Sequence, residues 1–173
     1  MNKKKMRKTH FPQSREVLKK EMILKNSYFN RYMLFRYSLA LFFFSNIYWG
    51  IILWAQMGLY IILPSLLLVL IAWSYAEQFR MYGTQQIYLK RTKQTFYCQG
   101  ATQILLLALT VMTNQFSKIF PIFADNLSSH LFIAMLLILG ILLVLYNLKR
   151  IQEISENKDR YYRRFQAIEN SYH

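Results

Sequence analysis

Side chains that could carry out chemistry are few in this 173-residue chain. It contains eight Asp and Glu residues, three His and one Cys. Acid–base or nucleophilic catalysis needs several such groups at one place. Six acids instead lie near Lys or Arg in stretches expected to be helical and exposed, where surface ion pairs are the ordinary outcome: Glu16, Glu21, Glu153, Glu156, Asp159 and Glu169. We therefore expect no catalytic site and no enzymatic activity.

Metal and cofactor chemistry is equally poorly supplied. His10, His130 and His173 are far apart in the chain, and no orienting partner is evident for any of them. Cys98 is the only cysteine, so it can form neither an intrachain disulfide nor a cysteine-based zinc site. The five glycines form no phosphate-binding loop. We expect no metal site and no cofactor, and we expect Asp125 to stand alone.

Glu77 is the one acid at the edge of an apolar segment. Arg80 follows it at a spacing that allows an ion pair on a helix, which is the ordinary interpretation. The alternative is a membrane-embedded enzyme in which Glu77 acts together with Ser74 on a lipid or a peptide.

Uncharged polar residues interrupt the apolar segments at Asn46, Gln103, Thr110, Thr113 and Asn114. Hydrogen bonds between helices in a membrane contribute about 0.6 kcal/mol each on average, so such residues usually hold helices together. The alternative is a hydrated path for a solute. Because no charged residue lies at mid-membrane, proton- or sodium-coupled transport is disfavoured.

Four apolar segments must position these groups: residues 38–54, 59–76, 101–117 and 131–148. A bilayer core of about 30 Å requires about 20 helical residues, and each segment is nearly free of charge over close to that length. The pattern predicts an all-α, polytopic membrane protein with four transmembrane helices arranged as two hairpins. We further expect Pro64 to bend the second helix, the third helix to run from Gln85 to Ser117, and Ser129 to cap the fourth.

Basic residues are distributed asymmetrically about these segments. If each segment crosses a bilayer, 21 of the 22 Lys and Arg residues fall on one side and only Lys118 on the other. Positive charge is retained in cytoplasmic loops, which predicts a plasma-membrane protein with both termini in the cytoplasm. Attraction to an anionic inner leaflet, about 1 kcal/mol per cation near the surface, accounts for the net charge of +14 without a nucleic-acid partner.

Outside the spans, three regions are expected. Residues 1–13 read as a disordered basic tail, residues 14–36 as an amphipathic interfacial helix, and residues 149–173 as a cytoplasmic helical extension after the transmembrane domain of residues 37–148. The extension carries five apolar residues at heptad spacing: Ile151, Ile154, Tyr161, Phe165 and Ile168. Lys158 occupies one further position of the same series. This seam could pack on the protein's own helices, bind a partner or a second copy, or remain unpacked.

The function that these features favour is that of a non-enzymatic accessory or scaffold subunit of a larger membrane complex. One alternative is an oligomeric pore or small-solute transporter component lined by the intramembrane polar residues. The other is the membrane-embedded enzyme built on Glu77, which the scarcity of catalytic groups disfavours.

Overall fold

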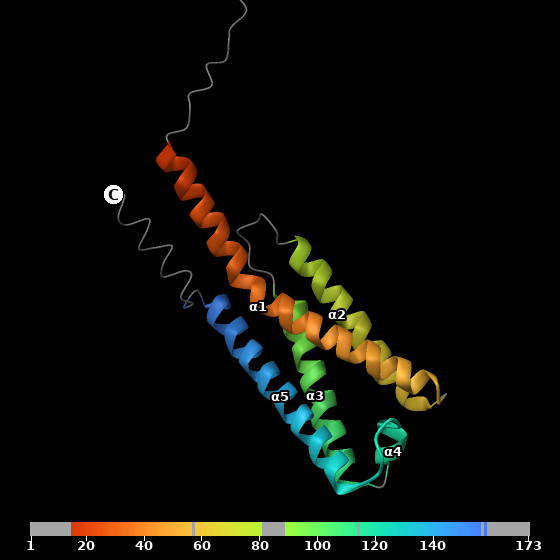
Figure 1. The fold of residues 1–173 in the computed structure, drawn as a ribbon. Helices are drawn as coiled ribbons and strands as arrows, with labels where there is room; N and C mark the ends of the chain where they lie inside the picture. Colours follow the sequence, from red (N-terminus) through yellow and green to blue (C-terminus); the bar gives the residue numbers. More distant parts are fainter. Residues whose placement is uncertain (1–14, 57, 81–88, 114, 157, 159–173) are drawn as a thin grey trace, which may run out of the picture.

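The structure is a computed structural model that describes residues 15–56, 58–80, 89–113, 115–156 and 158 (Figure 1). These residues form only helices and their connections. In chain order the helices are α1 (Arg15–Trp54), the 3-10 turn η1 (Leu59–Ile61), α2 (Ile62–Arg80), α3 (Lys90–Met112), α4 (Phe116–Ile119) and α5 (Leu127–Ser155).

Four stretches of helix are long and apolar enough to cross a membrane: Met33–Trp54, Leu59–Arg80, Lys90–Met112 and Leu127–Ser155. Between 17% and 39% of each stretch is buried inside the protein. Most of its apolar side chains therefore face outward, as expected for helices surrounded by lipid rather than water. The expectation of an all-helical protein with four candidate membrane spans is confirmed.

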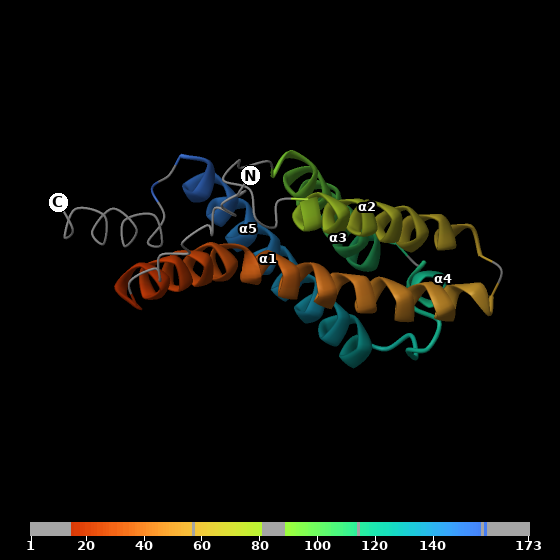
Figure 2. The same ribbon diagram turned by 90° about the horizontal axis from the view of Figure 1, so that it is seen from above.

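The helices form a bundle in which α1 packs on α2, α2 on α3, and α3 on α5 (Figures 1 and 2). The short helix α4 lies at one end, beside the connection between α1 and α2; we call this the loop end. Residues 15–32 of α1 project beyond the other helices at the opposite end, which we call the arm end (Figures 1 and 2). We call that projecting part the α1 arm.

The hydrophobic core lies towards the arm end and centres on Phe96 of α3. Its ring packs at 6.3 Å, centroid to centroid, against both Phe35 and Phe42 of α1. Ile151 and Ile154 of α5 belong to the same buried cluster. Three helices thus converge on one aromatic side chain, which fixes their relative rotation.

Close packing of α3 on α5 depends on glycine. A Cβ at Gly100 would lie 3.1 Å from Val144, and one at Gly140 would overlap the side-chain amide of Gln103. Small residues at such positions let two helices in a membrane approach closely.

Several helix ends differ from the sequence-based expectations. The third helix ends at Met112, not Ser117: Thr113 has extended backbone, and its hydroxyl donates to the Leu109 carbonyl at 2.6 Å. That hydroxyl occupies a carbonyl of the last turn, and Thr competes in this way with helix continuation. Residues 85–88, where this helix was expected to begin, lie outside the described residues.

The beginnings and ends of α2 and α5 also differ. Asn126, not Ser129, caps α5, because its side-chain oxygen accepts from the Ser129 backbone N–H at 2.8 Å. Pro64 is the third residue of α2, where a missing N–H costs no intrahelical bond, so no interior bend is required. The helix α5 ends at Ser155, within the helical extension expected for residues 149–173, and residues 159–173 lie outside the described part of the chain.

Candidate functional site

Polar side chains run through the interior of the bundle. Ten are buried among the described residues: Ser38, Asn46, Ser74, Gln78, Thr92, Thr95, Gln99, Gln103, Thr110 and Asn147. The sequence analysis singled out Asn46, Gln103 and Thr110, and the structure places all three between helices.

Asn46 joins α1 to α3. Its side-chain nitrogen donates to the Gln99 side-chain oxygen at 3.1 Å and to the Phe42 carbonyl, one turn earlier in α1, at 2.8 Å. Only 3% of Asn46 is exposed, so its amide does not face lipid or a second copy of the chain. This arrangement favours a role in packing over a role in lining a path.

Two further contacts join the remaining helices. The Asn147 side-chain nitrogen donates to Ser38 Oγ at 2.9 Å, which links α5 to α1. The hydroxyls of Ser74 and Thr95 lie 2.6 Å apart and link α2 to α3. Together with the contact between Asn46 and Gln99, each of the four long helices has a polar link to a neighbour.

The sequence analysis missed Ser38, Thr95, Gln99 and Asn147 as interior contacts. A signal for part of the set was present, because polar residues recur along one face of α3 at Thr92, Thr95, Gln99, Gln103 and Thr110. Their steps of three, four, four and seven residues follow the helical repeat. Which residues on the other helices these side chains contact depends on how the helices are rotated and offset against one another, which the spacing does not show.

Some buried amide atoms have no hydrogen-bond partner among the described residues. These are Gln103 Oε1, Asn147 Oδ1 and both side-chain polar atoms of Gln78. An unpaired buried polar group costs about 1–3 kcal/mol, so these positions weaken the bundle that the paired residues strengthen.

The two threonines at the loop end of α3 bond back to their own helix. The Thr110 hydroxyl donates to Leu106 O at 2.8 Å, and Thr110 is 2% exposed. Thr113 is half-buried, and Asn114 lies outside the described residues. The proposed lining of a pore by Asn46, Thr110, Thr113 and Asn114 therefore gains no geometric support.

Glu77 caps the beginning of α3. Its Oε1 accepts from the Arg91 backbone N–H at 3.0 Å, and its Oε2 accepts from the backbone N–H and the hydroxyl of Thr92 at 2.8 and 3.0 Å. Backbone N–H groups at a helix start lack intrahelical partners, and a carboxylate there is stabilised by the helix dipole. The expected pairing with Arg80 is not among the contacts of the described residues.

Among the described residues, Ser74 has no hydrogen-bond contact with Glu77. Its hydroxyl contacts Thr95 and donates to Leu70 O at 3.1 Å, one turn earlier in α2. Each of the two residues thus has its own partners on or near α3, and their contacts stabilise the packing of α2 on α3.

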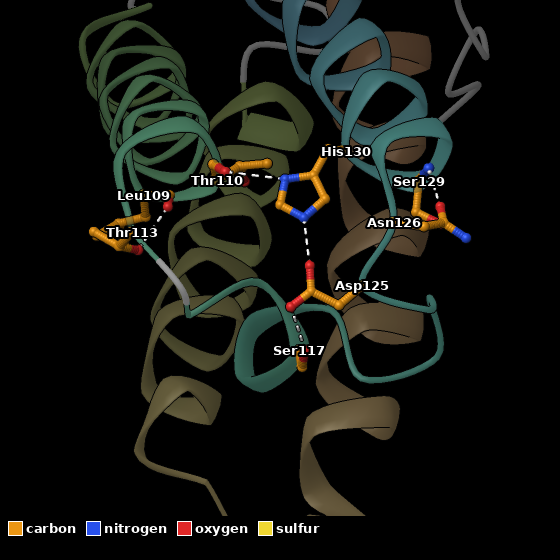
Figure 3. A network of polar contacts seen from close by, with 8 residues as sticks. All are labelled: Leu109, Thr110, Thr113, Ser117, Asp125, Asn126, Ser129 and His130. Carbon is orange, nitrogen blue, oxygen red and sulfur yellow. Dashed lines mark hydrogen bonds and ion pairs between the residues drawn. The ribbon is translucent and has the colours of Figure 1, made fainter.

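A second polar cluster lies at the loop end (Figure 3). The Nε2 of His130 lies 2.7 Å from Asp125 Oδ1, and its Nδ1 lies 3.2 Å from the Thr110 carbonyl oxygen. Ser117 Oγ donates to Asp125 Oδ2 at 3.2 Å. The ring of Phe116 stacks on the imidazole at a centroid distance of 4.0 Å. The expectations that Asp125 stands alone and that His130 lacks a partner are wrong. Because α3 ends at Met112, the following connection places Asp125 beside His130 in the first turn of α5.

This cluster does not have the order of a nucleophile–base–acid relay. In such a relay the imidazole lies between the hydroxyl and the carboxylate. Here the Asp125 carboxylate lies between Ser117 and His130, so the imidazole does not contact the hydroxyl. The hydrogen bond from His130 is the main cause that lowers the pKa of Asp125, partial burial opposes it, and Ser117 adds to it.

The loop end is closed by aromatic contacts to α1 and to η1, the turn that precedes α2. Trp49 Nε1 donates to the Ile119 carbonyl at 2.9 Å, and its ring stacks on Phe120. Tyr60 OH donates to Gln115 Oε1 at 2.8 Å. These contacts fix α4 against the ends of both helices.

Two of the five apolar residues of the proposed partner seam are used inside the protein. Ile151 and Ile154 are 3% and 0% exposed and belong to the core around Phe96, so neither is available to another chain. This favours packing of the extension on the protein's own helices. Tyr161, Phe165 and Ile168 lie outside the described residues.

Comparison with known proteins gives no relative: no family model, no curated protein and no solved structure matches this chain. The class is therefore defined by the fold itself. It is an all-helical protein with four helices long and apolar enough to span a membrane, held together by interhelical polar contacts.

Proposed function

We propose that this chain is a plasma-membrane protein with both termini in the cytoplasm and that it acts as a non-enzymatic accessory or scaffold subunit of a larger membrane complex. The orientation is supported by the retention of positive charge on one side. By this criterion the arm end faces the cytoplasm and the loop end, with Lys118, faces outward.

The observation that carries the proposal is the length of α1. It comprises 40 residues, about 60 Å at 1.5 Å per residue, although residues Met33–Trp54 alone are long enough to cross a bilayer. The α1 arm thus extends a helix beyond the bundle (Figure 1). A helix that projects from a membrane domain without needing to cross the bilayer is suited to holding another protein.

The interior contacts support the same proposal. Three polar contacts join α1, α2, α3 and α5, which suits a rigid platform: Asn46 with Gln99, Ser74 with Thr95 and Asn147 with Ser38.

The test is affinity purification of the tagged full-length chain from its native membrane in a mild detergent, followed by mass spectrometry. We expect one partner in a fixed stoichiometric ratio. The matched control is a chain in which residues 15–32 are shuffled in order, since it keeps the charge that orients the protein. We expect it to insert normally and lose the partner. A chain that is recovered alone, or a partner retained equally by both, contradicts the proposal.

A further inference from the structure

Both ring nitrogens of His130 face oxygen atoms that can only accept hydrogen bonds. Nδ1 faces the Thr110 carbonyl and Nε2 faces the Asp125 carboxylate (Figure 3). A neutral imidazole has one N–H and can donate to one of these oxygens, whereas an imidazolium has two and can donate to both. The geometry is complete only when the ring carries a second proton.

We propose that His130 is a proton-binding site that closes the loop end of this protein. The protonated ring joins the last turn of α3, the first turn of α5 and the connection that holds Asp125. Loss of the proton removes one of the two N–H donors, so one of the two links is released.

The local electrostatics are compatible with a positive ring at this position. The start of α5 carries a positive partial charge and opposes it. The Thr110 carbonyl belongs to the negative end of α3, and the Asp125 carboxylate adds a full negative charge. Lys118 of α4 is the other charged residue of the loop end, and it is exposed. From Gln103 to Met112 of α3 there is no ionisable residue, and from Leu127 to Leu148 of α5 the only one besides His130 is Tyr146, sixteen residues further along the helix.

Water can reach the site. The side chains of His130 and Asp125 are 29% and 51% exposed, so protons exchange with the solvent on the loop-end side. The ring also lies flat against Phe116, whose helix is tied to Trp49 through Ile119. Release of the Thr110 link loosens α3 against α5, and release of the Asp125 link loosens the connection that follows α4.

The first test reads the protonation state directly. The full-length chain is labelled with ¹⁵N-histidine, with His10→Gln and His173→Gln so that only His130 gives imidazole signals, and is placed in lipid nanodiscs. We expect both ring nitrogens to be protonated at about pH 5.5 and only one at about pH 8.5. A neutral ring at both pH values overturns the proposal.

The second test reads the consequence. Amide hydrogen exchange of residues 115–123, corrected for the intrinsic pH dependence, is compared at about pH 6 and pH 8. In the wild type, the protection of these amides should fall about threefold to tenfold as the pH rises, which corresponds to the loss of about one hydrogen bond. The His130→Gln variant should show no such change, with the amides of α2 as internal reference. An equal change in the variant overturns the proposal, and should that variant not fold, the nitrogen spectrum of the native ring decides alone.

Discussion

At the residue scale, Gly140 is the position where one added carbon meets a polar side chain. A Cβ there would overlap the Gln103 amide, whose oxygen is already buried without a partner. We expect Gly140→Ala to lower the free energy of unfolding by about 1 kcal/mol, the lower end of the usual cost of overpacking, because the atoms that it meets are the end of the flexible Gln103 side chain. Unfolding of the purified protein in mixed micelles measures this. Gly58→Ala is the control, since a Cβ there contacts nothing within 4 Å and the Gly58 φ of −81° suits any residue. Equal losses in the two variants would contradict the packing described here.

The contact between Asn46 and Gln99 can be measured by a double-mutant cycle. We expect Asn46→Ala and Gln99→Ala to be less than additive, with a coupling energy of about 0.6 kcal/mol and at most about 1.7 kcal/mol. Unfolding in the same micelles gives all four values. Strict additivity would show that the 3.1 Å hydrogen bond does not stabilise the bundle.

The sequence identified individual polar residues better than their partners. Asn46, Gln103 and Thr110 were recognisable because an apolar helix makes each polar residue conspicuous. Gln99 and Asn147 were not assigned contacts, because a hydrogen bond between helices depends on their rotation and vertical register. In this protein Phe96 and the glycines at the α3–α5 contact set that register.

At the element scale, α2 and α3 are coupled through the Glu77 carboxylate. Its removal by Glu77→Ala leaves two backbone N–H groups at the start of α3 without their acceptor. We expect a loss of about 1 kcal/mol, as for other helix caps, and a smaller loss in Glu77→Gln, which keeps one acceptor oxygen. Amide exchange of Arg91 and Thr92 should accelerate in the Ala variant. Unchanged exchange there would show that Glu77 does not cap this helix.

The connection before α5 should respond to acid through Asp125. Its pKa in the folded protein lies below the ordinary value of 3.8, so the carboxylate stabilises the folded state above that value. This contribution is lost as the pH falls below 3.8 and through the folded pKa, when Asp125 is protonated. We expect protection of the amides near Ser117 and His130 to decrease in this acid range in the wild type.

Asp125→Asn is the matched variant for that experiment, because it keeps the size and one acceptor oxygen but cannot ionise. Its protection should be lower than that of the wild type at pH 7 and should show no further decrease in acid beyond that of the α2 amides. An identical acid profile in the two proteins would remove the stabilising role of the carboxylate.

The four long helices were predictable, and their ends were not. Long uncharged runs determine that a helix can cross a bilayer, and all four appear. Helix ends depend on which side chain captures a terminal backbone group. Ser129 and Asn126 could each cap α5, and Thr113 could either continue α3 or end it, so local sequence alone did not decide between them.

At the scale of the whole molecule, the asymmetry of charge leads to a prediction about sidedness. In a Cys98→Ser background, Ser128→Cys at the loop end should react in intact cells with a maleimide that does not cross membranes. Arg80→Cys at the arm end should react only after the membrane is permeabilised. Both positions are exposed, so access alone does not distinguish them. Reaction at Arg80→Cys in intact cells would reverse the proposed orientation.

The contact of Trp49 with α4 means that intrinsic tryptophan fluorescence can report on the position of α4. Trp54 and Trp73 are 72% and 55% exposed, so both are accessible to quenching groups outside the bundle. The Trp49 indole is instead bound to Ile119 and stacked on Phe120. When brominated acyl chains quench Trp54 and Trp73, any remaining shift in the emission wavelength therefore originates at Trp49, where α4 meets α1.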